Sequence, residues 1–75
     1  RPYHAFDSRR SHPGFPDLVL VRKGRLIFAE LKADRGRTTP DQREWAADLG
    51  AVGGPVEYHL WRPADLDSVA AVLGR

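Results

Sequence analysis

The chain has 75 residues, of which 41% are hydrophobic and 29% charged, a composition typical of one small globular domain spanning residues 1–75. It contains no cysteine, which excludes a disulfide framework and a thiolate zinc site and fits a reducing, cytoplasmic setting. No apolar run approaches the roughly eighteen residues that cross a bilayer, so we expect no membrane partner.

The net charge is only +2, but the basic residues are distributed unevenly. Nine of them fall in the first half of the chain: Arg1, Arg9, Arg10, Arg22, Lys23, Arg25, Lys32, Arg35 and Arg37. Charge alone favours a solvated surface, yet a basic half without an acidic run also suits a phosphate-rich partner.

The first two segments precede the main apolar region. Residues 1–6 (RPYHAF) contain two aromatic side chains and are expected to form an edge strand, and residues 7–13 (DSRRSHP) to form a loop. Arg9 and Arg10 suit phosphate oxygens, with Ser8, Ser11 and His12 as weaker donors. A solvated loop without a ligand is the alternative.

Residues 14–32 (GFPDLVLVRKGRLIFAELK) predict two short strands joined at Lys23-Gly24. Gly24 supplies the positive φ of a primed hairpin turn. Before the first strand, Pro16 suits a strand start, and Gly14 permits close approach of a backbone or ligand.

The register of this hairpin determines whether its charges meet. A two-residue loop places Val21 opposite Leu26 and Asp17 opposite Glu30, with Lys32 on the same face, whereas a three-residue loop moves Asp17 to the other face. Directly opposed carboxylates are unfavourable without a cation. We therefore expect a divalent metal with hard oxygen ligands, such as magnesium.

A helix is predicted from Thr39 to Gly50. Thr39 is its expected N-cap, Pro40 its first residue, and Gln42 completes a capping box. Gln42 also begins an otherwise apolar stripe with Trp45, Ala46 and Leu49. Two interpretations stay open: Gln42 only closes the cap, or it faces the carboxylates.

The last third predicts a strand and a short helix. Residues 56–61 (VEYHLW) alternate as a strand that runs parallel to residues 26–32 in a βαβ unit. A final amphipathic helix follows, with Asp65 as N-cap and Gly74 as stop.

These motifs resemble the PD-(D/E)xK nuclease superfamily, since Pro16-Asp17 is followed after twelve residues by Glu30-Leu31-Lys32. The wider wording, with GFPD, GRTTPDQREW and a strand ending in WRP, resembles a small stand-alone VRR-NUC (virus-type replication–repair nuclease) domain from about Asp7 to Leu73. That resemblance implies a restriction-endonuclease-like α/β fold, a mixed sheet of hairpin plus βαβ flanked by helices.

It also implies a site that hydrolyses DNA with Mg²⁺ or Mn²⁺. Asp17, Glu30 and the carbonyl of Leu31 would be metal ligands, Lys32 would act on the attacking water or the transition-state charge, and Gln42 would support the site. The expected nucleic-acid contacts are Ser8, Arg9, Arg10, His12, Arg35 and Arg37. Relatives often add an acidic residue from an upstream helix; that ligand is absent here, lies before Arg1, or is replaced by water.

The resemblance further suggests a homodimer that cuts branched or four-way DNA, encoded by a bacterium or phage and nucleoid-associated. A non-catalytic DNA-binding or dimerisation module and an RNA-directed nuclease are the alternatives. His4, His12 and His59 lack zinc-site spacing, which disfavours an HNH-type nuclease, and no serine has a hydrolase motif.

Overall fold

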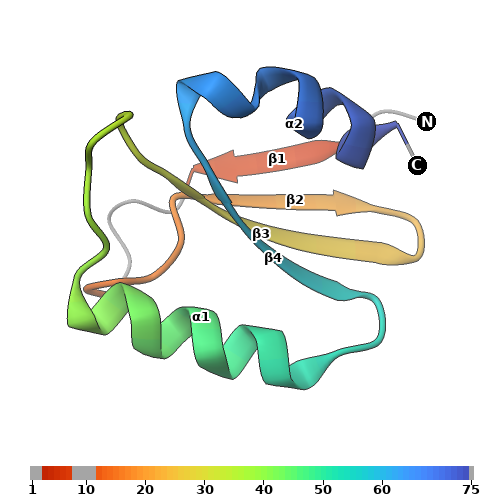
Figure 1. Ribbon diagram of the computed structural model, residues 1–75. Coiled ribbons are helices and arrows are strands. Elements are labelled where there is room, and N and C mark those ends of the chain that lie inside the picture. Colours follow the sequence, from red (N-terminus) through yellow and green to blue (C-terminus); the bar gives the residue numbers. More distant parts are fainter. Residues whose placement is uncertain (1–2, 8–11, 75) are drawn as a thin grey trace.

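A mixed four-stranded sheet lies between two helices in the computed structural model, which describes residues 3–7 and 12–74. The strands follow the order β1 (His4–Asp7), β2 (Leu18–Arg22), β3 (Arg25–Leu31) and β4 (Val56–Trp61). The helix α1 (Pro40–Val52) lies below the sheet in Figure 1, and the 3-10 turn η1 (Pro63–Asp65) leads into α2 (Leu66–Leu73) above it. The first three strands are antiparallel and β4 runs parallel to β3. The predicted α/β class and the predicted edge strand and parallel strand are confirmed.

The β2–β3 hairpin has the predicted two-residue turn. Val21 pairs with Leu26 and Val19 with Phe28, while Gly24 has a φ of 81°. Positive φ at this position is accessible to glycine at little steric cost, and it matches the twist of the flanking strands. The turn therefore sets the register that places the start of β2 beside the end of β3.

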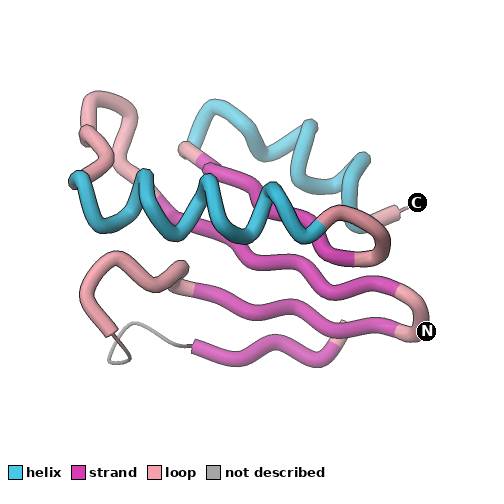
Figure 2. The backbone as a smooth tube through the Cα atoms, turned by 90° about the horizontal axis from the view of Figure 1, so that it is seen from below, coloured by secondary structure: helices cyan, strands magenta, loops and turns pink. Residues whose placement is uncertain are grey.

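Side-chain alternation divides the sheet into two faces. Leu20, Ile27, Ala29, Trp61 and Val72 form the buried core on the α2 side, with Ile27 and Ala29 fully inaccessible. On the other face Phe15 packs edge-on against Phe28 and Trp45. Figure 2 views this second face, with α1 in front of the strands and running along only part of the sheet.

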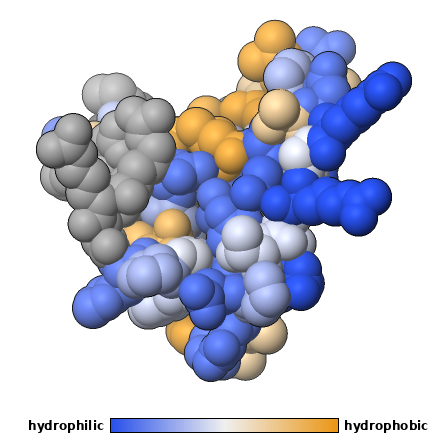
Figure 3. Space-filling model, turned by 90° about the vertical axis from the view of Figure 1, so that its left-hand side faces the viewer, coloured by the Kyte–Doolittle hydropathy of each residue, from blue (hydrophilic) through white to orange (hydrophobic). Residues whose placement is uncertain are grey.

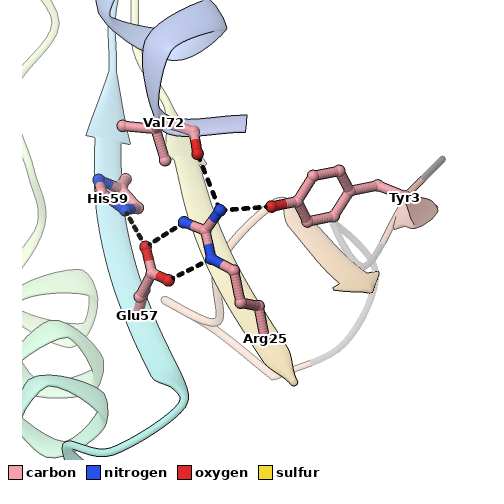
Figure 4. Close-up of polar contacts among 5 residues, drawn as sticks. All are labelled: Tyr3, Arg25, Glu57, His59 and Val72. Atoms are coloured by element: carbon pink, nitrogen blue, oxygen red, sulfur yellow. Dashed lines mark hydrogen bonds and ion pairs between the residues drawn. The ribbon is translucent and has the colours of Figure 1, made fainter. Parts of the chain in front are cut away.

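A polar cluster links β3, β4, α2 and Tyr3, which precedes β1, at the end of the sheet near the hairpin turn (Figure 4). Arg25 donates through Nε and Nη2 to the carboxylate of Glu57, at 2.7 Å each. Its Nη1 donates to the hydroxyl of Tyr3 at 2.6 Å and to the carbonyl of Val72 at 2.8 Å. The last contact satisfies a carbonyl in the final turn of α2, where backbone acceptors lack helical partners. The cluster holds β3, β4, α2 and the residue before β1 in one arrangement.

The predicted end of the first helix is wrong, whereas the predicted N-cap position of the last helix, Asp65, is confirmed. The first helix continues past Gly50 to Val52, and Gly53, with a φ of 67°, ends it. A glycine inside a helix lowers its stability only modestly and does not end it, so the helix ends at Gly53 instead of Gly50. Asp65 does precede α2, but its side chain accepts from the backbone N–H of Arg62 at 2.8 Å instead of capping α2.

Neither helix in the described ranges has the length and hydrophobicity needed to cross a bilayer.

Candidate active site

Asp17 stands just before β2 and reaches across the hairpin. Its Oδ2 accepts a hydrogen bond from the backbone N–H of Leu31 at 2.9 Å. Because Leu18 pairs with Ala29, the same register continued by one residue sets Asp17 opposite Glu30. The structure thus brings together the two carboxylates that the hairpin pattern predicted to meet.

Glu30 is the buried member of this pair, with only 2% of its surface exposed. Its Oε1 accepts from Gln42 Nε2 at 3.0 Å, and its Oε2 has no hydrogen-bond donor among the described residues. Burial, followed by the hydrogen bond and repulsion involving Asp17, raises the pKa of Glu30 to about 7, although the charge of Lys32 opposes the rise. When Glu30 is protonated it can donate to Asp17; when both are ionised, neither can donate and Oε2 is left without a partner.

Lys32 follows Glu30 on the same face of the strand. Its backbone N–H donates to the carbonyl of Trp61 at 2.9 Å, which extends the parallel pairing with β4 beyond the end of β3. Its half-buried side chain lies against the next turn, since a Cβ placed on Gly36 would be 3.5 Å from Lys32 Cδ. Its positive charge acts on Glu30, because it lowers the pKa of that carboxyl against the larger effect of burial.

Gln42 closes the capping box and also faces a carboxylate of the predicted site. Its Oε1 accepts from the N–H of Thr39 at 2.9 Å and its N–H donates to Thr39 Oγ1 at 3.1 Å, which completes the capping box. Its other end, Nε2, donates to Glu30. A single amide thereby joins the start of α1 to the buried carboxylate.

Gly14 explains why α1 begins beside the site. A Cβ at this position would lie 2.5 Å from the carbonyl carbon of Asp41 and 2.7 Å from the nitrogen of Gln42. Only a residue without a side chain permits this contact between the segment before β2 and the first turn of the helix. Phe15 then packs on Trp45, and the fully buried Pro16 leads directly to Asp17.

Tyr58 is a neighbour of the site that sequence reasoning did not identify. It pairs with Phe28 and lies on the same face as Glu30. Burial, with smaller effects from Glu30 and Asp17, raises its pKa. The alternation of β4 was the available signal, because a parallel register places Tyr58 beside Phe28 on the face of the carboxylates.

The structure describes only some of the residues predicted to contact nucleic acid. His12, Arg35 and Arg37 are exposed. Ser8, Arg9 and Arg10 lie outside the described residues, so their expected role stays a prediction. Figure 3 views the end of the molecule at which β3 ends and α1 begins, and much of its non-grey surface is hydrophilic.

The donors at this end suit a hard divalent cation. Within residues 3–7 and 12–74, no group of three or more His, Asp or Glu side chains is placed to hold a metal, so the carboxylate pair would need further oxygen ligands. Glu30 Oε2 is buried and receives no hydrogen bond from residues 3–7 and 12–74, as expected for an oxygen that a cation would satisfy. The Leu31 carbonyl lies on the same edge of the strand as its N–H, which faces Asp17. These groups fit the ligand set predicted from the sequence.

The family comparison agrees with this geometry. A family model described as "VRR-NUC domain" matches residues 3–59. The chain belongs to the VRR-NUC family. Neither the curated proteins nor the solved structures contain a match to it.

The matched part of this VRR-NUC domain contains Asp17, Glu30, Lys32 and Gln42 and ends within β4, so α2 lies outside it. Membership implies a nuclease-type function in DNA processing, with DNA as the substrate. The family generally uses divalent metals.

Proposed function

We propose that this VRR-NUC domain is a metal-dependent DNA endonuclease of the PD-(D/E)xK type, with Asp17, Glu30 and Lys32 at its centre. The observation that carries the proposal is the opposition of Asp17 to a buried Glu30 whose Oε2 has no donor among the described residues. Two carboxylates in this arrangement destabilise the folded state unless a cation binds them.

Mg²⁺ or Mn²⁺ would be held by Asp17, Glu30 and the Leu31 carbonyl, and when bound would supply Lewis-acid stabilisation of phosphate charge. In hydrolysis, a water oxygen forms a new bond to phosphorus, the bond to the leaving oxygen breaks, and the water's proton is lost as the leaving oxygen gains one. Lys32, as an ammonium, orients the water and offsets the negative charge that develops on the phosphoryl oxygens. Gln42 fixes the position of Glu30 through Nε2.

The substrate is proposed to be branched DNA, including four-way junctions, recognised by its backbone more than by its bases. The described residues offer exposed arginines suited to phosphates, Arg35 and Arg37, beside the site. A homodimer would present two such sites to two strands. Exposed Leu31 and Leu66, at 44% and 73%, border an apolar groove of about 440 Å³ on the α2 side, which supports contact with a second copy.

Cleavage of linear, flapped and four-way DNA, measured with Mg²⁺, with Mn²⁺ and with EDTA, tests this proposal. Asp17→Asn, Glu30→Gln and Lys32→Ala should each reduce the rate at least about 100-fold. The exposed acid Glu44, changed to Gln, is the matched control and should leave the rate unchanged. Cleavage that persists in EDTA or in the Asp17 variant would refute the assigned roles.

The same experiment separates the alternatives. Salt-sensitive DNA binding without cleavage by any metal would favour a non-catalytic binding module. Preferential cleavage of a matched RNA would favour an RNA-directed nuclease. Light-scattering mass measurements of the wild type and of Leu66→Glu test the homodimer, which should dissociate when a charge enters the apolar surface.

A further inference from the structure

The turn that follows the E-x-K segment is held by an arginine from the far end of β4. Arg62 Nη1 donates to the carbonyl oxygens of Ala33 and Gly36, both at 2.7 Å, and approaches that of Asp34 at 3.3 Å. The turn closes on itself through a 3.0 Å hydrogen bond from Gly36 N–H to the same Ala33 oxygen. One guanidinium nitrogen therefore binds three of the four carbonyls of the turn Ala33–Gly36.

The backbone of Arg62 is itself fixed by hydrogen bonds at both its N–H and its carbonyl group. Its backbone N–H donates to Asp65 Oδ2 and its carbonyl accepts from Asp65 N–H, each at 2.8 Å. This reciprocal pair ties the residue to η1, so that its side chain starts from a defined position. The backbone of Asp65 and that of Arg62 thus serve as a fixed base for the contact with the turn.

The turn and the residue after it carry two exposed charges, Arg35 and Arg37. Arg35 and Arg37 are exposed and make no hydrogen bond or ion pair with the residues that the structure describes. The same turn lies against the stem of Lys32 through Gly36. The position of the turn is thus defined relative to the proposed site, with Arg35 and Arg37 exposed beside it.

We propose that Arg62 is a positioning residue that presents Arg35 and Arg37 to the phosphate backbone of the DNA substrate. The inference rests on the proposed function. An exposed turn has many conformations, and ordering it before binding removes that entropy cost from the association step. A guanidinium suits this role because the group stays charged and its N–H donors lie in one plane.

A double-mutant cycle tests the proposal, using the 75-residue chain in EDTA so that no strand is cut. Binding of a labelled four-way junction and of a linear duplex is measured over a series of salt concentrations. Arg35→Ala/Arg37→Ala should lower the slope of log Kd against log salt by about two, since two phosphate contacts are lost. Arg62→Ala alone should raise Kd about tenfold and lower the slope by about one.

The decisive comparison is Arg62→Ala added to the Arg35→Ala/Arg37→Ala protein. If Arg62 acts by presenting these arginines, the added change should alter Kd by less than about twofold. An equal loss in both backgrounds would mean that Arg62 contacts DNA itself, which overturns the proposal. Lys23→Ala removes one charge at the opposite end of β3 and should leave Kd and the slope nearly unchanged.

Hydrogen exchange provides a second readout that does not depend on DNA. The Gly36 amide should exchange faster in Arg62→Ala, whereas amides within the β2–β3 pairing should be unaffected. If Arg62→Ala fails to fold, Arg62→Lys, which keeps the charge but not the planar fork, is measured in both backgrounds. Unchanged Gly36 exchange overturns the Arg62 role alone, whereas absence of DNA binding by the wild-type chain at low salt overturns the proposed function as well.

Discussion

Gln42 Nε2 donates a 3.0 Å hydrogen bond to Glu30 Oε1, while Gln42 Oε1 closes the capping box with Thr39 N–H. One side chain therefore links the stability of α1 to the orientation of a buried carboxylate. This coupling means that a single substitution can affect folding and chemistry together, and that two different substitutions are needed to separate them.

Gln42→Ala and Gln42→Glu should have different consequences. Alanine removes the capping acceptor and should lower the free energy of unfolding by about 1 kcal/mol. Glutamate keeps the acceptor but replaces the donor to Glu30 with a third carboxylate, so it should retain α1 and lose at least about 10-fold in cleavage rate at neutral pH. Circular dichroism during urea unfolding and a DNA cleavage assay measure the two effects. Equal activity of Gln42→Glu and wild type would contradict this link.

Glu30 should make the metal-free protein less stable as the pH rises from about 4.5 to about 7. A carboxyl whose pKa is higher in the folded state binds a proton there that the unfolded state has released, so stability is lost over this window. Asp17, Lys32, Gln42 and Tyr58 are the groups that face it. The loss from Glu30 should reach about 3 kcal/mol at most.

Urea unfolding of wild type and Glu30→Gln at several pH values measures this loss. The variant should be the more stable protein at neutral pH without metal and should show a flatter profile. Added Mg²⁺ should stabilise wild type near pH 7 and release a proton, because it binds the ionised carboxylate. Parallel pH profiles for the two proteins would show that Glu30 does not titrate in this range.

Glu57 should produce the opposite slope at lower pH. Its hydrogen bonds from Arg25 and then its contact with His59 hold its pKa at about 2, so its contribution is complete above about 4.5 and is lost as the pH falls through 2. Glu57→Gln should lower Tm by about 5 °C or more at pH 6, since charged hydrogen bonds are lost. It should also lose less stability than wild type on acidification. Glu44→Gln, an exposed acid on α1, serves as the control.

Gly14→Ala and Gly24→Ala form a matched pair, because both glycines have φ near 80°. At Gly24 nothing lies within 4 Å of an added Cβ, so only the backbone strain of about 1 kcal/mol applies. At Gly14 the methyl group would also strike the backbone of α1, so the total cost should exceed about 2 kcal/mol. Chemical denaturation compares the two variants. Equal costs would show that the segment before β2 moves away from α1 freely.

Several features followed from local sequence because local physics determines them. The Lys23-Gly24 turn and the alternation of the strands define the β2–β3 register, and that register alone predicts that Asp17 meets Glu30. Thr39, Pro40 and Gln42 likewise mark the start of α1, since a capping box depends on residues three positions apart. These interactions were predictable because their partners are close in sequence or related by one turn.

Tertiary structure decided the contacts that join distant segments. Three such contacts link residues more than twenty positions apart. They are the hydrogen bonds of Arg62 to the turn Ala33–Gly36, those of Arg25 to Glu57, and the contact of Gly14 with Asp41. The hydrophobic periodicity of the sequence does not specify which arginine donates to which carbonyls, because that depends on how β4 and α1 pack against the hairpin. The sequence alone thus predicted that Asp17 meets Glu30 and that Gln42 caps α1, because local pairing decides both, and only the packed fold determined what holds these residues in place.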